Sequence, residues 1–468
     1  MSDRRFLRLA STSARLLIGT VVSIAAVVAV VTAVSLPWPV VERAPLSIQA
    51  TPEPGDTIAV CDGPLLALGR QSQAAAELSL AASATVTAGV AEGASAATES
   101  RLESSNVTNA DPVPVFTAAP EDGVRSDVAA SSSTSVRSDD LAGFAASACR
   151  PPLLESWLVG GAGTTGAADL VVLSNPGDVP AAVQLALFGA QGESTPAGGS
   201  IVIAPRTQRV LPLAGIAFGE DSPVIRVTAT GGPVQASLQT SITRTLVPGG
   251  VDQSGALAAP TRTVVITGID ASARAETDDA TSLLRLLSPS ADTTASVTVL
   301  PVGGTSPIGE PSTIPLTAGS PVEVDLGLRD AGRYTVVVEA DEPVVAAAWQ
   351  ATGLGEGDDF AWYTPSDEIA VPTLFATPAG APPRVTLANT ADVDAAVRIA
   401  TTDGSFSTEV AVAAGSSVDV PLPSRGVYLL DPGATTVRAA VSFASAGALA
   451  GFPVWPADAA AQAITVYP

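Results

Sequence analysis

Short runs in which apolar and polar residues alternate fill the chain from about residue 153 onward, and turns rich in Gly, Pro, Asn and Asp separate them. A period of two is typical of strands with one buried face. The turn sequence LSNPGDVPAAVQL at 173–185 returns as LSPSADTTASVTV at 287–299 and as LANTADVDAAVRI at 387–399. This recurrence predicts one structural unit used three times.

A second landmark recurs at similar spacing. APRT at 204–207, TAGS at 317–320 and AAGS at 413–416 each precede another alternating run. About seven short strands in roughly 100 residues favour a two-sheet sandwich. We therefore predict three tandem immunoglobulin-like β-sandwiches: a first repeat at 153–262, a second at 263–372 and a third at 373–468.

The N-terminal part has a different pattern. LLIGTVVSIAAVVAVVTAVSL at 16–36 carries no charge, and as a helix it would be about 32 Å long against a hydrocarbon core of about 30 Å. Arginines gather before it, which favours a cytoplasmic N-terminus and an extracytoplasmic remainder. The sequence predicts a cytoplasmic tail at 1–15, a single transmembrane helix at 16–36 and a linker at 37–56. The fold class is all-β with this one helix.

A cleaved signal peptide is the alternative. Ala33, Val34 and Ser35 would form a small-residue cleavage site. The apolar run is longer than in most signal peptides, however, and Pro37 lies just past the cut. We therefore favour an uncleaved signal-anchor in the cell membrane.

Two cysteines, Cys61 and Cys149, flank a segment rich in Ala, Ser and Thr. In an oxidising compartment an even pair most simply forms one disulfide, and two free thiols are the alternative. We predict a disulfide-closed, β-rich lobe at 57–152.

Charge and composition narrow the function. All 23 basic residues are arginine, histidine and lysine are absent, and the net charge is −23. Without imidazole or lysine, the common bases, metal ligands and phosphate-gripping groups are missing. A surface this acidic repels nucleic acid. We expect a non-enzymatic protein that binds neither a cofactor nor nucleic acid.

Four short motifs carry a family resemblance: CDGPLL at 61–66, CRPP at 149–152, SWLVGG at 156–161 and LSNPG at 173–177. With these motifs the chain resembles an uncharacterised actinobacterial family of single-pass cell-envelope proteins with an exported domain of unknown function. The resemblance extends over most of the chain from about residue 16. It implies an envelope location and a paired Cys61 and Cys149, and it implies no reaction.

The densest acidic cluster is Glu356, Asp358 and Asp359, in GLGEGDDFAWYTPSDE. Carboxylates on a Gly-rich loop suit Ca²⁺, but the spacing lacks the EF-hand order. The default interpretation is a solvated acidic loop, so these residues are weak metal candidates and we predict no metal site. Paired carboxylates also suit a glycosidase, whose sugar-stacking aromatics could come only from Trp349, Trp362 and Tyr363 nearby.

These observations predict a membrane-anchored, extracytoplasmic scaffold or protein-binding module of the bacterial cell envelope, without catalysis. Its expected partners are the membrane, through the N-terminal helix, and an envelope protein or glycan. The alternative is a carboxylate-based enzyme or a lectin-like module that acts on envelope polysaccharide.

Overall fold

The computed structural model describes residues 3–35, 48–50, 53–70, 77–244, 246–271, 281–458 and 464–466. It is mostly β-strand with one long N-terminal helix, which confirms the predicted fold class. The described chain divides into two units, residues 1–52 with 462–468 and residues 53–461. Most of the predicted linker at 37–56 lies outside the described residues.

The first unit contains the helix α1 (Asp3–Ser35) and one small strand pair. The segment Ala14–Ser35 has a mean hydropathy of 2.6 and is long enough to cross a membrane, a property that signal sequences share. The helix begins well before residue 16, so most of the predicted tail is helical. The strand β1 (Ile48–Ala50) pairs antiparallel with β35 (Ile464–Val466).

The second unit begins with the lobe, whose strands form small sheets and also extend a sheet of the first repeat. The order β19-β18-β12-β16-β6-β8-β2 is continuous, with β16 and β6 parallel, so the boundary predicted at residue 152 does not separate the sheets. The lobe strands are β2 (Thr57–Val60), β3 (Leu65–Leu68), β4 (Leu78–Ala82), β5 (Thr85–Val90), β6 (Thr98–Ser104), β7 (Val107–Thr108), β8 (Val113–Ala118), β9 (Val128–Arg137) and β10 (Ala142–Ala148).

The first repeat consists of two sheets that enclose one apolar core. The second sheet follows the order β11-β17-β13-β14, and β15 also pairs with β13. A short 3₁₀ turn, η1 (Leu213–Gly215), follows β16. The strands are β11 (Glu155–Val159), β12 (Leu170–Asn175), β13 (Ala181–Gly189), β14 (Gly192–Ser194), β15 (Ser200–Ile203), β16 (Thr207–Pro212), β17 (Val224–Thr230), β18 (Gln235–Arg244) and β19 (Val247–Gly255).

The second repeat differs because one long strand, β25 (Gly332–Ala351), takes part in both groups of strands around its core. Its first half pairs with β20 and β22, and its second half pairs with β21 and β26. The alternating pattern predicts two separate runs here, at 334–340 and 344–350. The other strands are β20 (Thr261–Ala271), β21 (Ser282–Leu287), β22 (Thr293–Pro301), β23 (Ser312–Leu316), β24 (Val322–Asp325) and β26 (Phe360–Tyr363).

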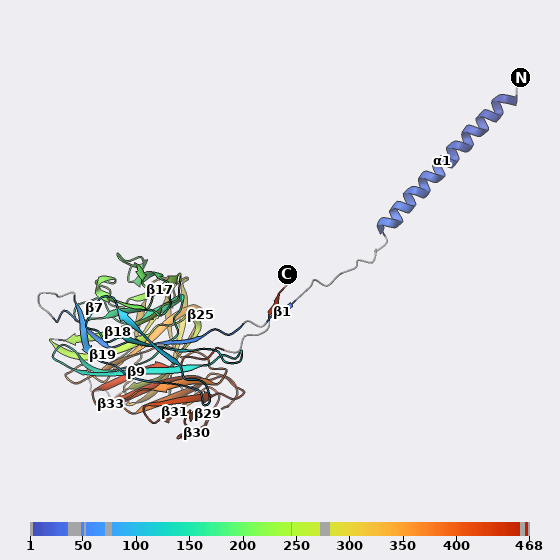
Figure 1. Ribbon diagram of the computed structural model, residues 1–468. Helices are drawn as coiled ribbons and strands as arrows, with labels where there is room; N and C mark the ends of the chain where they lie inside the picture. The colour runs from blue at the N-terminus through green and yellow to red at the C-terminus, as the bar shows by residue number, and fades with distance from the viewer. Residues whose placement is uncertain are drawn as a thin grey trace. The chain divides into compact units, whose positions relative to one another are not determined.

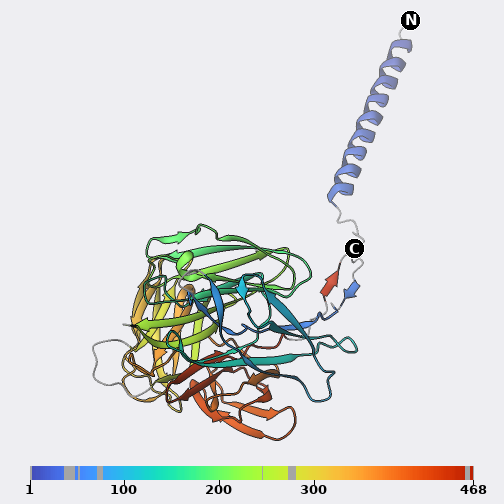
Figure 2. The same cartoon turned by 60° about the vertical axis from the view of Figure 1, so that its left-hand side comes forward.

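The third repeat has two four-stranded sheets, β27-β32-β29-β30 and β31-β28-β33-β34. Phe144 and Ala146 of the lobe complete its core. Figures 1 and 2 show lobe strands between the first and third repeats, where β10 packs against both β19 and β34. The strands are β27 (Thr373–Thr377), β28 (Pro383–Asn389), β29 (Ala395–Thr401), β30 (Ser407–Val412), β31 (Ser416–Pro421), β32 (Gly426–Asp431), β33 (Arg438–Ser445) and β34 (Ala448–Pro453).

The two sequence landmarks contact each other in every repeat. In the first repeat Arg206 forms an ion pair with Asp178. In the second, Asp292 accepts a hydrogen bond from the backbone N–H of Ala318, at 2.8 Å. In the third, Asp394 accepts one from Ala414, at 2.9 Å. The recurring Asp turn therefore ties two loops together, which gives a physical reason for the repeat.

Each repeat supplies most of the residues of one apolar core, yet the three repeats do not form separate domains. A further cluster of buried apolar side chains, including Trp157, Phe188 and Trp349, joins the first repeat to the second. Residues 53–461 accordingly form one compact unit. The exact domain boundaries and the immunoglobulin-like assignment stay predictions.

Candidate functional site

The three acidic candidates do not converge on one point. Glu356 is exposed, and Asp358 accepts a hydrogen bond from the backbone N–H of Gly355, at 2.7 Å. Asp359 is fully buried, so the expectation of a solvated acidic loop is wrong at this position. Within the described ranges, no group of three or more Cys, Asp or Glu side chains is arranged to hold a metal ion.

Asp359 instead connects three parts of the second unit. One oxygen, Oδ2, accepts backbone N–H groups from Phe144 of the lobe at 2.9 Å and from Leu449 of the third repeat at 3.0 Å. The other, Oδ1, accepts the N–H of Val251 in the first repeat at 3.2 Å. Burial raises the pKa of Asp359 to about 7, against the lowering effect of these hydrogen bonds. The side chain therefore has a structural role between segments.

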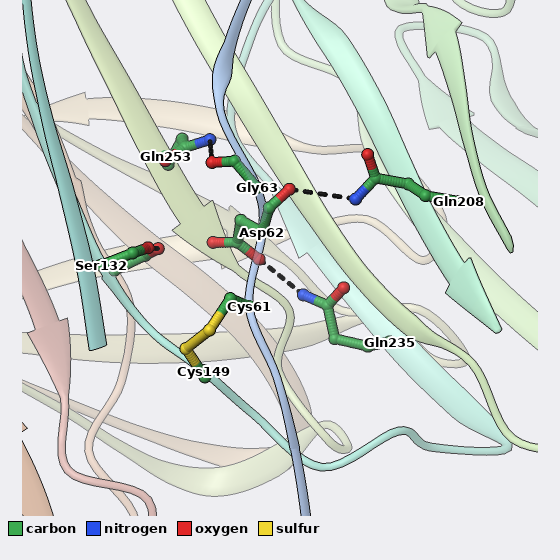
Figure 3. Close-up of a disulfide and its surroundings, with 9 residues drawn as sticks. Cys61, Asp62, Gly63, Ser132, Cys149, Gln208, Gln235 and Gln253 are labelled. Carbon is green, nitrogen blue, oxygen red and sulfur yellow. Dashed lines mark hydrogen bonds between the residues drawn. A yellow bond between two sulfur atoms is a disulfide. The ribbon is translucent and has the colours of Figure 1, made fainter. Parts of the chain in front are cut away.

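Cys61 and Cys149 form a disulfide, as predicted (Figure 3). The chain that follows Cys61 is held by glutamines of the first repeat. Gln235 donates to the carboxylate of Asp62 at 2.6 Å, and Gln208 donates to its backbone carbonyl at 3.0 Å (Figure 3). Gln239 bonds both backbone groups of Leu66, at 2.9 and 2.6 Å. Side-chain amides thus replace strand pairing at this junction.

The charged groups of this junction are buried, which leaves little access for a ligand. Burial raises the pKa of Asp62, while nearby Ser147, Ser237 and Arg150 oppose the rise. Arg150 is itself buried, donates to the carbonyl of Ala256 at 2.6 Å and stacks over Trp455 with 5.2 Å to the ring centroid. The CDGP and CRPP motifs therefore serve packing.

A groove of about 380 Å³ lies between the lobe and the third repeat. It is bordered by β2 and β27, each of which ends its sheet. Val60 exchanges backbone hydrogen bonds with Arg150, at 2.8 and 2.9 Å, on the side away from β8. Because backbone groups alternate along a strand, Ile58, which lines the groove, directs its N–H and C=O to that same side.

A second hollow, of about 210 Å³, lies at the edge of the apolar contact between the first and second repeats. We call it the aromatic cavity; it is lined by Gly161, Ala162, Ala167, Asp169, Thr240, Ile242, Arg244, Leu283, Arg285, Glu323, Trp349, Phe360 and Trp362. Trp349 on β25 lies directly opposite Trp362 on β26, so the two indoles share one face of the sheet. Phe360 packs beside Trp349, with 6.0 Å between ring centroids.

The SWLVGG motif forms one wall of the aromatic cavity. Gly160 has a φ of 151°, and a Cβ there would come within 3.2 Å of the Trp362 ring. Gly161 has a φ of 70°, and a Cβ there would come within 2.8 Å of the Asp169 carboxylate. Only glycine fits both positions without strain. The motif thus lets the chain pass close to the indole and the carboxylate.

The polar groups of the aromatic cavity are mostly engaged. Arg285 lies with its guanidinium carbon 4.8 Å from the Trp362 ring centroid and pairs with Glu323 at 2.8 Å. Asp169 accepts backbone N–H groups from Ala162 at 2.7 Å and Ser241 at 2.8 Å. Burial raises its pKa to about 7. The aromatic side chains of the cavity thus lie beside Arg285 and Asp169, whose charged groups already have partners.

One buried polar side chain of the aromatic cavity lacks a partner among the described residues. Thr240 is 2% exposed, and its hydroxyl oxygen forms no hydrogen bond with the described residues. A buried hydroxyl without a partner costs about 1–3 kcal/mol. Sequence reasoning noted Trp349 and Trp362 as possible sugar-stacking residues, but it did not find Thr240 or Asp169. Those two come from the first repeat, and no local pattern links them to the indoles.

The described chain is thus an all-β protein with a disulfide and an N-terminal apolar helix long enough to cross a membrane. Residues 104–423 match a family of unknown function, DUF5719, and the chain belongs to this family. The match includes the SWLVGG motif and every residue that lines the aromatic cavity, whereas Cys61 lies outside it. No curated protein matches the chain.

Proposed function

We propose that this protein is a membrane-anchored, extracytoplasmic binding and scaffold module of the cell envelope, which captures a protein partner without catalysing a reaction. The helix α1 would hold the chain in the membrane, and the unit at 53–461 would present its surface outside. An apolar N-terminal span and a disulfide both fit an exported protein in an oxidising compartment.

The observation that carries the proposal is the part of the β2 edge that lies before the Val60–Arg150 pair and borders the groove. The N–H and C=O of Ile58 point away from β8, and β27 borders the opposite side with its own edge. An extended peptide can add to such an edge through main-chain hydrogen bonds. The proposed partner is therefore an envelope protein that offers an extended segment.

A proline at position 58 tests this directly. Ile58→Pro removes an N–H that faces the groove and takes no part in the β2·β8 ladder, and edge strands tolerate proline at such positions. The matched control, Ile58→Val, keeps the N–H. Full-length protein in detergent is used to capture partners from envelope extracts. We expect one protein to be retained by the wild type and by Ile58→Val, and to be lost with Ile58→Pro.

Two results would argue against the proposal. Retention of the same proteins by all three variants would show that the β2 edge is not the binding site. Release of reducing ends from purified wall glycan, abolished by Glu356→Gln, would favour the enzymatic alternative. The membrane topology is tested separately: protease added to intact cells should cleave a C-terminally tagged chain outside the membrane, and complete protection would contradict the anchored orientation.

A further inference from the structure

We infer that the aromatic cavity between the first and second repeats is a binding site for a single uncharged pyranose ring, such as the end of a neutral glycan chain. This inference concerns a different surface from the β2 edge and does not depend on the proposed capture of a protein.

The size of the cavity limits the ligand to about one ring. Its volume of about 210 Å³ is below the roughly 300–1,000 Å³ of sites for drug-sized molecules. Arg244 at the rim is exposed, so the cavity opens to solvent there. A terminal sugar could enter while the rest of its chain stays outside.

The aromatic floor favours a ring with an apolar face. Trp349 and Trp362 lie directly opposite each other on β25 and β26, and because Arg285 already covers the Trp362 ring, Trp349 is the indole left to contact a ligand ring. Both are almost fully buried, at 6% and 5% exposure, and Phe360 packs beside Trp349, so the indoles are fixed in place. A rigid amphipathic surface of this kind loses little side-chain entropy when a ring packs on it.

The polar groups favour hydroxyls over a purely apolar ligand. The Thr240 hydroxyl is buried, lines the aromatic cavity and has no partner among the described residues. An aromatic or aliphatic ligand would leave it unpaired, at continued cost. A sugar hydroxyl can both donate to it and accept from it, because each hydroxyl is a donor and an acceptor.

The charges favour a neutral ligand. Both donors of the Arg285 guanidinium edge that faces Glu323 are occupied, at 2.9 and 2.8 Å, and its other nitrogen donates to Gly161 at 2.8 Å. At the buried end of the aromatic cavity the only described cation that an anion would meet is Arg285, which is already engaged, and a cation would find Glu323 already paired. Arg244 is charged too, but it lies at the exposed rim, where solvent screens its charge. An uncharged polyol meets neither penalty.

Tryptophan fluorescence of the full-length protein in detergent can measure binding, because two of the five tryptophans line the aromatic cavity. The probes are glucose, galactose, mannose and N-acetylglucosamine, with glucuronate as a charged sugar and p-cresol as an aromatic ring. We expect a saturable change with at least one neutral sugar, and little change with glucuronate or p-cresol.

Thr240→Val separates binding from folding. It removes an unpartnered buried hydroxyl and keeps the shape, so thermal stability should stay equal or rise. The affinity for the neutral sugar should fall roughly fivefold, because the variant loses one hydrogen bond to the ligand. Trp349→Phe should weaken binding further, because it shortens the indole floor. The matched control is Thr294→Val, which changes an exposed threonine on β22.

Three results would overturn the inference. The first is the absence of a saturable change with any of the four neutral sugars. The second is binding of p-cresol without binding of sugars, which would indicate an aromatic side chain of a protein as the occupant. The third is an unchanged sugar affinity in Thr240→Val.

Discussion

Replacement of Asp359 tests whether one carboxylate holds three segments of the second unit together. Its two oxygens accept backbone N–H groups from Phe144, Leu449 and Val251. In Asp359→Asn one of these oxygens becomes an NH₂ group, which cannot accept a hydrogen bond. At least one buried N–H therefore loses its partner, whichever way the amide turns.

The magnitude follows from the number of lost acceptors. Each buried N–H left unpaired costs about 1–3 kcal/mol. We expect Asp359→Asn to lose about 2 kcal/mol and Asp359→Ala, which loses all three bonds, about 3–5 kcal/mol, because neighbouring losses do not add fully. At about 2.1 cal/mol/K per residue, the unfolding entropy of residues 53–461 is about 0.9 kcal/mol/K. The melting temperature should then fall by roughly 2 °C and 3–6 °C.

The assay is differential scanning calorimetry of the two variants beside Glu356→Gln, an exposed acid in the same loop. The control should stay within about 0.5 kcal/mol of the wild type. If Asp359→Ala melts at the same temperature as Glu356→Gln, the reasoning is refuted, because the three N–H groups must then find other acceptors.

Two further predictions concern pH and the disulfide. Burial raises the pKa of Asp169 and Asp359 to about 7, whereas an ordinary carboxyl has a pKa near 3.8. Between these two values the folded state binds protons that the unfolded state has released. Protonation of the two carboxyls therefore stabilises the folded state at low pH, and this stabilisation is lost as pH rises through about 7. The melting temperature should be higher at pH 5.5 than at pH 8, with a smaller difference in Asp169→Asn, and a rise toward pH 8 would contradict this. Replacing Cys61 and Cys149 together by serine opens a loop with a sequence separation of 88, which costs up to about 4.6 kcal/mol in the chain-entropy model. A reductant should lower the melting temperature of the wild type but not of the double variant. Equal melting temperatures of the wild type and the double variant without reductant would disprove the contribution of the disulfide.

The sequence predicted the features that depend on neighbouring residues in the chain, namely the helix, the strands and the repeated turns. The uncharged run at 16–36 predicted the helix, the alternating runs predicted the strands, and the Asp turns predicted a repeated unit whose loops are now seen in contact. The pairing of Cys61 with Cys149 followed from composition and compartment.

Contacts between repeats could not be predicted in the same way. Asp359 lies in a Gly-rich acidic stretch that is typical of solvent-exposed loops, yet three distant segments bury it. Thr240 and Trp349 come together only because one face of the first repeat packs on the second. A period of two identifies the buried face of a strand and does not specify which other sheet covers it.

The glutamines that contact residues 62–66 all follow both cysteines in the chain. Synthesis runs from the N-terminus, and domains generally fold in that order. Cys149 emerges before Gln208, Gln235, Gln239 and Gln253, which bond the backbone or carboxylate of residues 62, 63 and 66. Cys61 and Cys149 can therefore pair before the segment that carries these amides has folded, and the first repeat then closes over a segment that is already anchored at one end.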